Sequence, residues 1–292
     1  MGQDKKYHKP INDSFVNVLS AIGNENRPEV KITARPFLKW VGGKRSILQE
    51  LVKRVPEDYT SYNEPFLGGG ALFFELQPEV AKLSDINFHL IITFRAVQND
   101  IENLIKHLKV HEAKHCKEYY LKARKKLSTE QDPTKIASLF IYINKTCFNG
   151  LYRVNKAGGF NVPMGDYKNP AILDEDNLRN VNKVLEDVDI RQQSFNQIKP
   201  KKDAFYYLDP PYHDTYSQYD GSGFGNEEHM QLALFCGEIN RAGGYFMLSN
   251  SDNEFVRKLY KIYNIETVSA YRSISCKAYQ RGKKNEVIVR NY

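Results

Sequence analysis

Residues 61–85 read SYNEPFLGGGALFFELQPEVAKLSD, and this stretch decides the fold. A short strand is predicted to lead into the glycines at 68–70, a helix follows, and residues 80–84 predict a second strand that ends at Asp85. This succession is how an α/β sheet begins. Strand character returns at residues 188–192, 204–208, 245–249, 265–269 and 287–290, so the two halves of the sheet are far apart in the chain.

The stretch between these halves has a different pattern. Charged, helix-favouring segments at 91–110, 116–127 and 133–143 precede a stretch rich in Gly, Asn and Pro at 144–170. Helical spacing of apolar residues also occurs at 46–55, 227–240 and 254–263. We therefore expect a catalytic sheet domain from 36–87 and 187–292, an inserted and mainly helical domain at 88–186, and a polar extension at 1–35 with a short helix at 15–22.

Composition narrows the class of protein. The 292 residues carry a formal net charge of +7 at a pI near 9.0, and 41% are hydrophobic. This excludes a disordered polyanion, and the lack of a long apolar run argues against a membrane span. The four cysteines form no C-x-x-C pair, which indicates neither zinc nor a disulfide framework, and no metal is expected. The N-terminus has no apolar core of a signal peptide, so a cytoplasmic protein is expected.

The glycine turn is a candidate ligand site. Gly68 and Gly70 follow a strand, where glycines let the backbone approach a ligand. The dinucleotide fingerprint needs a third small residue, but Phe73 stands there, and no Walker-type phosphate loop occurs. A nucleoside cofactor without a pyrophosphate remains, with Asp85 placed to accept hydrogen bonds from ribose hydroxyls. A purely structural turn and an Asp that simply ends a strand are the alternatives.

The most specific motif is Asp209, Pro210, Pro211 and Tyr212 after the strand at 204–208. Two prolines make a rigid turn that presents carbonyl acceptors beside a carboxylate. Such a site suits the exocyclic amine of a nucleobase. If Asp209 and the Pro210 carbonyl each accept one N–H, the nitrogen lone pair is freed for attack, and the Tyr212 ring stacks on the base. An ordinary proline-rich turn is the alternative.

A third motif precedes both. Trp40 is the only tryptophan, and it lies in FLKWVGGK at 37–44, beside two glycines and two lysines. It is a candidate stacking wall, with Lys44 as an ammonium for a ligand carboxylate. Trp40 is equally a core tryptophan before a turn.

Together, FLKWVGGK at 37–44, EPFLGGGA at 64–71 and DPPY at 209–212 resemble the Dam-type, or D12 class, DNA adenine-N6 methyltransferases. The resemblance continues through SDIN at 84–87, FNGLYRVN at 148–155, FNVP at 160–163, RSIS at 272–275 and RGKK at 281–284. It implies a Rossmann-like methyltransferase sheet, S-adenosylmethionine as methyl donor, and an inserted target-recognition domain that coincides with the helical block.

The resemblance also implies the roles of single residues. The cofactor would contact Trp40, Lys44, Asp85, Asp209 and a floor around the glycine turn, for which the predicted residues are Glu64, Pro65, Phe66, Gly68, Gly70 and Phe195. The turn from Asp209 to Tyr212 would hold a target adenine, which must leave the duplex because its N6 is paired and stacked inside it. Methyl transfer would be direct, without a covalent enzyme intermediate.

Target recognition is expected in Lys39 and in a loop and β-hairpin at 144–167. Arginine matches the acceptor pair of guanine, so Arg153 is the first candidate for direct base reading. By resemblance to GATC-modifying relatives, Lys39, Leu151, Arg153 and Pro163 serve base recognition, and Phe148 and Asn149 fill the gap left by the flipped base. The predicted DNA contacts also include Lys145, Tyr167 and Arg281. The alternative is a basic loop of which only one or two members meet bases.

The leading hypothesis is therefore a GATC-specific DNA adenine methyltransferase that acts as a monomer on nucleoid DNA, alone or with a cognate restriction endonuclease outside any stable complex. Methylation of cytosine N4, which is also a conjugated amine, is a chemical neighbour. A catalytically silent DNA-binding regulator and an RNA or protein amide methyltransferase are the alternatives from other classes. The sequence of residues 213–219 differs from the segment that many GATC enzymes carry at this place. This loop is expected to flank the flipped base, so the difference bears on which bases next to the target the enzyme prefers.

Overall fold

The computed structural model describes residues 31–155, 158–213, 224–272 and 282–292. The helix expected at residues 15–22 and most of the predicted N-terminal extension lie outside these ranges. Ile32 to Tyr292 form one structural unit, and all that follows concerns that unit.

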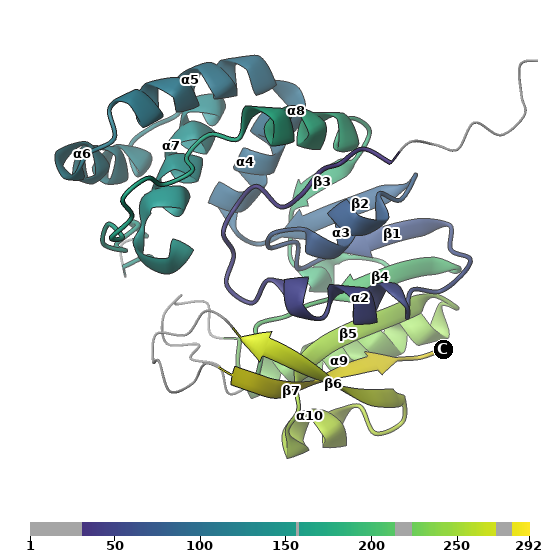
Figure 1. Ribbon diagram of the computed structural model, residues 1–292. Coiled ribbons are helices and arrows are strands. Elements are labelled where there is room, and N and C mark those ends of the chain that lie inside the picture. Colours follow the sequence, from purple (N-terminus) through teal and green to yellow (C-terminus); the bar gives the residue numbers. More distant parts are fainter. Residues whose placement is uncertain (1–30, 156–157, 214–223, 273–281) are drawn as a thin grey trace, which may run out of the picture. The chain divides into compact units, whose positions relative to one another are not determined.

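Within the described ranges the sheet has seven strands in the order β3-β2-β1-β4-β5-β7-β6 (Figure 1). Their bounds are β1 (Ser61–Glu64), β2 (Ala81–Asp85), β3 (Asp189–Gln192), β4 (Ala204–Leu208), β5 (Tyr245–Ser251), β6 (Asn264–Arg272) and β7 (Gly282–Arg290). Strands β1 to β5 pair in parallel, and β7 runs antiparallel between β5 and β6. The predicted α/β class is confirmed. Strands β6 and β7 are longer than expected, because they pair with each other over nine residues and backbone pairing continues past the apolar stretch.

Alternation along β4 builds a core on each face of the sheet. Phe205 and Tyr207 point into one core, and Tyr206 and Leu208 point into the other. The second core is closed by α9 (Asn226–Arg241) and α10 (Glu254–Leu259), whose apolar residues face β4 and β5. The first is closed by α3 (Ala71–Leu76), α2 (Leu48–Val52) and the helices inserted between β2 and β3. The segment predicted as one helix at 46–55 forms a short 3-10 turn, η1 (Lys44–Ser46), and α2.

The inserted helices are α4 (Phe88–Asn99), α5 (Ile101–Ala113), α6 (Lys117–Leu127), α7 (Pro133–Thr146) and α8 (Glu175–Val184). They lie together on one side of the sheet, beyond β2 and β3 (Figure 1). Helix α4 packs on β2, β3 and α7, so it joins this layer to the sheet. The buried side chains of Leu104, Phe140 and Val181 belong to the same continuous core as Phe205.

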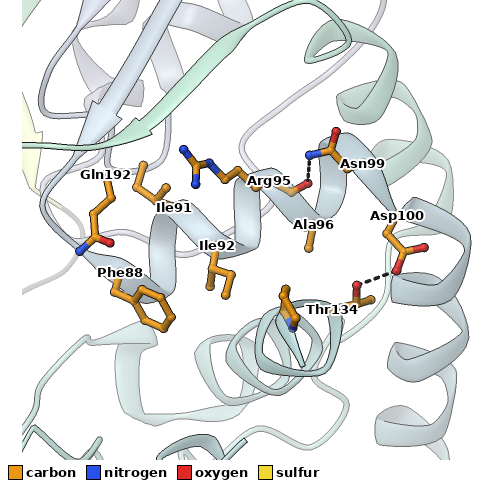
Figure 2. A pocket seen from close by; sticks show the side chains of 10 residues that line it. Phe88, Ile91, Ile92, Arg95, Ala96, Asn99, Asp100, Thr134 and Gln192 are labelled. Atoms are coloured by element: carbon orange, nitrogen blue, oxygen red, sulfur yellow. Dashed lines mark hydrogen bonds between the residues drawn. The ribbon is translucent and has the colours of Figure 1, made fainter. Parts of the chain in front are cut away.

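The prediction of one helical segment over 91–110 was wrong, because the chain breaks at Asp100, whose φ is −147°. The Asp100 carboxylate accepts hydrogen bonds from Asn103 Nδ2 at 2.8 Å and from Thr134 Oγ1 at 2.6 Å. The second bond ties the break to the start of α7 (Figure 2). A side chain that competes for local hydrogen bonds in this way favours a helix boundary over a continuous helix.

In the described part of the chain, no helix is long and apolar enough to span a bilayer.

Replacing Phe205 with alanine is expected to lower the free energy of unfolding by about 3–5 kcal/mol. The ring is fully buried and contacts the rings of Tyr59 and Tyr62. Urea denaturation measures the loss. Leu234→Ala is the matched control, because that side chain on α9 is 68% exposed, and it should change stability by no more than about 0.5 kcal/mol. Similar losses in both variants would contradict the assigned core.

Candidate active site

The order of the strands brings the two acidic motifs together. Strand β1 lies between β2 and β4, so the direction in which the strands are added reverses at β1 and β4. In open α/β sheets, ligands bind outside the carboxyl ends of the strands at such a reversal. Glu64 ends β1, and Asp209 directly follows β4. Two residues that are 145 positions apart in the sequence therefore meet at one edge of the sheet.

Asp209 is held by an ion pair that lies mostly away from water. Its Oδ2 is 2.6 Å from Lys44 Nζ, and the side chains are 19% and 7% exposed, respectively. Ser249 of β5 donates to Oδ1 at 3.2 Å, and the Ser249 hydroxyl also lies 3.0 Å from the Tyr207 hydroxyl. Burial raises the pKa of Asp209, and the Lys44 ammonium opposes that rise. Lys44 therefore favours the anionic form of the Asp209 carboxylate.

The turn after Asp209 presents an aromatic ring. Pro210 is buried and Pro211 is exposed. The Tyr212 hydroxyl donates to Glu286 Oε2 of β7 at 2.7 Å, and Lys44 Nζ lies 4.7 Å from the centre of the Tyr212 ring. Burial raises the pKa of Tyr212 well above its usual value, so the phenol stays protonated and donates. The ring is thus fixed at its hydroxyl by one strand and lies beside the ammonium that holds Asp209.

The glycine turn packs against the tryptophan. Gly68 has a φ of +47°, and a Cβ placed there would lie 2.8 Å from Trp40 Cδ1, so only glycine fits. The Gly68 N–H donates to Asp85 Oδ2 at 3.2 Å, and Asp85 Oδ1 accepts from the Asn87 N–H at 2.9 Å. Gly70, with a φ of +67°, precedes α3. Trp40 is therefore part of the wall of the turn, and Asp85 holds the loop by its own hydrogen bonds.

Three carboxyl groups gather at this edge. Burial raises the pKa of Glu64 to about 8, and the nearby Asp209 and Asp85 carboxylates add to the rise, although the Tyr62 hydroxyl donates to Glu64 at 2.8 Å. Burial also raises the pKa of Asp85, to about 6. The Lys44 ammonium, which pairs with Asp209, also places a positive charge near Glu64. A ligand with additional positive charge would relieve the repulsion between these acids.

Aromatic rings lie next to the acids. Phe66 and Phe195 have ring centroids 5.4 Å apart, and Phe224 lies 5.8 Å from Phe66. Phe195 follows β3, and Pro65 is buried at the start of the glycine turn. Ile86, directly after Asp85, is 57% exposed. Ile86 and the half-buried rings of Phe66 and Phe224 offer apolar surface to a planar group, with Pro65 and Phe195 buried beside them. The sequence motifs do not predict Phe224 and Ile86.

A second cluster joins the predicted DNA-contacting residues. Lys39 and Asn144 exchange two hydrogen bonds of 2.8 Å between side-chain amide and backbone. Lys39 Nζ donates to the Lys145 carbonyl at 2.9 Å and lies 3.9 Å from the centre of the Tyr167 ring. Burial and the charge of Lys39 lower the pKa of Lys145 to about 8. The segment at Lys39, the last turn of α7 and Tyr167 therefore lie together.

The predicted hairpin at 144–167 is short. Helix α7 continues to Thr146, and pairing in the described part of this stretch is limited to isolated bridges, Val154 with Phe160 and Cys147 with Met164. Arg153 Nε donates to Asn161 Oδ1 at 2.7 Å, so the predicted base-reading guanidinium holds the opposite arm of the hairpin. The other predicted residues of this stretch differ in exposure: Phe148 is 44% exposed, Pro163 is exposed, and Asn149 and Leu151 are half-buried. Arg281 lies outside the described residues.

A groove of about 300 Å³ runs along α4 and contains none of the predicted site residues (Figure 2). It is lined by Phe88, Ile91, Ile92, Arg95, Ala96, Asn99, Asp100, Pro133, Thr134 and Gln192. The chemistry-bearing groups lie elsewhere, at the carboxyl ends of β1, β2 and β4.

Sequence reasoning missed the residues that hold Asp209 and Tyr212 in place. Ser249 lies in an apolar strand, and Glu286 directly precedes the apolar run at 287–289. A polar residue at a buried strand position is the available signal, because such a group needs a hydrogen-bonding partner. The partner itself is set by strand pairing and is not visible in the sequence.

Comparison with known proteins gives close relatives. Residues 40–274 match the family described as D12 class N6 adenine-specific DNA methyltransferase. The chain is 41% identical over 287 residues to the Type II methyltransferase M.MjaIII of Methanocaldococcus jannaschii, covering 88% of this chain and 99% of the relative. It is 38% identical over 278 residues to the Type II methyltransferase M1.LlaDCHI of Lactococcus lactis subsp. cremoris, covering 90% and 97%. A DNA adenine methylase of Vibrio cholerae is 32% identical over 269 residues, covering 87% and 95%.

Replacing Lys44 with methionine is expected to destabilise the protein by about 3–5 kcal/mol near pH 8, because Asp209 loses its ion-pair partner. Without Lys44, burial and Glu286 hold the pKa of Asp209 above its unfolded value. The folded variant then binds the proton more tightly than the unfolded chain, and stability is lost as pH rises through the folded pKa. The loss relative to wild type should therefore be smaller near pH 5.

Urea denaturation of wild type and variant at both pH values tests this, and the comparison at equal pH removes the titration of Asp85. Lys44 also lowers the pKa of Glu64, so its removal raises that pKa and adds to the loss near pH 8 in the same direction. Lys53→Met is the control, since Lys53 is 66% exposed in its pair with Glu50, and it should show little loss at either pH. A loss from Lys44→Met that is equal at the two pH values would contradict the assigned ion pair.

Proposed function

The chain belongs to the D12 class of N6 adenine-specific DNA methyltransferases, and from this we propose that it methylates N6 of an adenine extruded from duplex DNA, within GATC, with S-adenosylmethionine as donor. The observation that carries the proposal is the buried Asp209 carboxylate, held by Lys44 beside the Tyr212 ring at the carboxyl end of β4. The enzyme class follows from the family. The methyl donor, the extrusion of the base from the duplex and the target sequence are what we propose beyond the enzyme class.

The residues at the reversal of the sheet fit S-adenosylmethionine. Glycine is required at position 68, which keeps the turn flat against Trp40. Glu64, Asp85 and Asp209 provide the acidic surroundings that a positively charged ligand requires. We propose that Trp40, Lys44, the turn from Glu64 to Gly70, Asp85 and Phe195 hold it. When bound, this cofactor supplies an electrophilic methyl group on a positively charged sulfur.

Asp209 and the Pro210 carbonyl would each accept an N–H of the adenine amine. This draws the nitrogen towards tetrahedral geometry and localises its lone pair, while the carboxylate stabilises the positive charge that develops on nitrogen. The Tyr212 ring would stack on the base, and its hydroxyl bond to Glu286 fixes the ring before the base arrives. No strong base is required, because the amine loses its proton after it has become alkylated.

We propose that residues 36–87 and 187–292 are the catalytic domain and that 88–186 recognise the target. The cluster of Lys39, Lys145 and Tyr167 gives this surface positive charge and an aromatic ring. Phe148, an exposed aromatic, would fill the gap left by the flipped base together with Asn149, and Leu151, Arg153 and Pro163 would contact bases. Phosphate contacts by Arg281 are part of the same proposal.

In the cell we propose a monomer in the cytoplasm, associated with the nucleoid through DNA. Two of the relatives are named Type II methyltransferases, which supports the same type here. A cognate restriction endonuclease would then share the target sequence without forming a stable complex.

Asp209→Ala is expected to lower the rate of methyl transfer to duplex DNA by at least about 10²–10³-fold, because the amine loses its charged acceptor. The assay uses labelled S-adenosylmethionine, a GATC duplex and analysis of the methylated nucleoside. Asp58→Ala, an exposed acid on a loop, is the control and should retain wild-type activity. Label on cytosine, or no label from a wild-type protein that binds cofactor and duplex, would overturn the proposal.

Arg153→Ala is expected to cost about 1–3 kcal/mol of discrimination at one base position. The measurement compares methylation rates on GATC duplexes and on duplexes with a single substitution. Asn161→Ala keeps the Arg153 guanidinium but removes the side-chain oxygen, Asn161 Oδ1, that accepts from Arg153 Nε. It therefore controls for loosening of the hairpin. If Asn161→Ala relaxes specificity to the same extent, Arg153 holds the hairpin and does not read a base.

A further inference from the structure

Tyr152 lies between two residues proposed to read bases, and its side chain points away from them into the protein. Its ring is stacked on Trp40 with a centroid distance of 6.1 Å and an interplanar angle of 29°. The rings of Phe140 on α7 and Phe160 on the other arm of the hairpin contact it at 5.9 and 5.8 Å. Its hydroxyl lies 3.1 Å from His89 Nδ1 on α4. One side chain therefore contacts the hairpin, the helical layer and the wall of the glycine turn.

The contacts continue from Trp40 to the proposed cofactor residues. Trp40 packs on Gly68, whose N–H donates to Asp85, which in turn accepts from the N–H of Asn87 at the start of α4. Helix α4 also carries His89, whose Nδ1 lies beside the Tyr152 hydroxyl, so this series of contacts returns to Tyr152. Burial raises the pKa of Tyr152, and the Asp85 carboxylate contributes to the rise.

We propose that Tyr152 is a positioning residue that couples target binding at the hairpin to cofactor binding at the glycine turn, through its stack on Trp40. The inference rests on the proposed function. DNA that fixes Leu151 and Arg153 also fixes Tyr152 between them, and this holds Trp40 against Gly68. Target duplex therefore tightens cofactor binding, and by thermodynamic reciprocity the cofactor tightens target binding by the same factor.

A purely structural Tyr152 makes a different prediction. The residue would then join the helical layer to the sheet, and its loss would lower stability or weaken both ligands without changing the factor by which one affects the other. The ratio of cofactor dissociation constants with and without target duplex therefore separates the two roles. Because Trp40 is the only tryptophan, its fluorescence reports directly on the proposed contact.

The experiment titrates S-adenosylhomocysteine, the demethylated product, so that no turnover occurs. Its dissociation constant is measured by calorimetry and by Trp40 fluorescence, alone, with a saturating GATC duplex, and with a duplex of scrambled target. Wild type should bind at least about 5-fold more tightly with the GATC duplex. Tyr152→Phe keeps the stack and should retain this ratio, whereas Tyr152→Leu should bring it close to that of the scrambled duplex.

Tyr119→Leu is the matched control. Tyr119 on α6 has the same type of contacts, a 2.8 Å hydrogen bond with His111 Nδ1 and an edge contact with Tyr142. Among the described residues, its ring stacks neither on Trp40 nor on an aromatic residue of the hairpin. It should keep the wild-type ratio. If Tyr152→Leu does not fold, Tyr152→Met replaces it, because a flexible unbranched side chain fills such gaps.

The outcomes are distinct. A wild-type ratio of one, or an unchanged ratio in Tyr152→Leu, overturns the role of Tyr152, while methyl transfer to GATC by the same preparations leaves the proposed function standing. A wild-type protein that binds no duplex overturns the proposed function itself. Loss of the ratio in Tyr152→Leu, with Tyr152→Phe and Tyr119→Leu unchanged, supports the coupling.

Discussion

The ion pair between Lys44 and Asp209 is the interaction on which the site depends. A carboxylate that is largely removed from water tends to take up a proton, and here Glu286 adds to that tendency. The ammonium at 2.6 Å opposes that rise in pKa and favours the charged form of the acceptor at the carboxyl end of β4. A neutral acid would accept hydrogen bonds from an amine far less well. In the proposed mechanism, methyl transfer to adenine therefore depends on a lysine that lies 165 residues earlier in the chain.

The same ion pair joins the segment that contains Trp40 to the turn from Asp209 to Tyr212. Lys44 follows the turn that contains Trp40, and its ammonium also lies beside the Tyr212 ring. Asp209 is further supported by Ser249 on β5, and Tyr212 by Glu286 on β7. Three strands and one loop thus fix two functional side chains. The site is positioned on rigid elements, which is what a reaction that depends on the alignment of an amine requires.

The inserted helices belong to the same structure as the sheet. Helix α4 starts three residues after Asp85, and its N-cap Asn87 also supplies the N–H that holds the Asp85 carboxylate. Phe140 and Tyr152 continue the core of the helical layer to Trp40. A division into catalytic and recognition domains describes roles in the proposed mechanism, but the two share one continuous apolar core. This continuity joins the proposed target site to the proposed cofactor site through packed side chains.

The sequence alone determined the α/β class, the position of the strands and the three motifs, because period-two apolar runs, glycine turns and prolines act locally. It also brought the Dam-type family into view, which the relatives confirm. Only the tertiary structure decided which charges meet: that Lys44 holds Asp209, that Glu286 holds Tyr212, and that Arg153 bonds to Asn161. The first two pairs come from strand order and loop contacts across long sequence separations, and the third from the way the hairpin folds back on itself. Local propensity carries no information about such pairings, because they are fixed by the burial of a shared core.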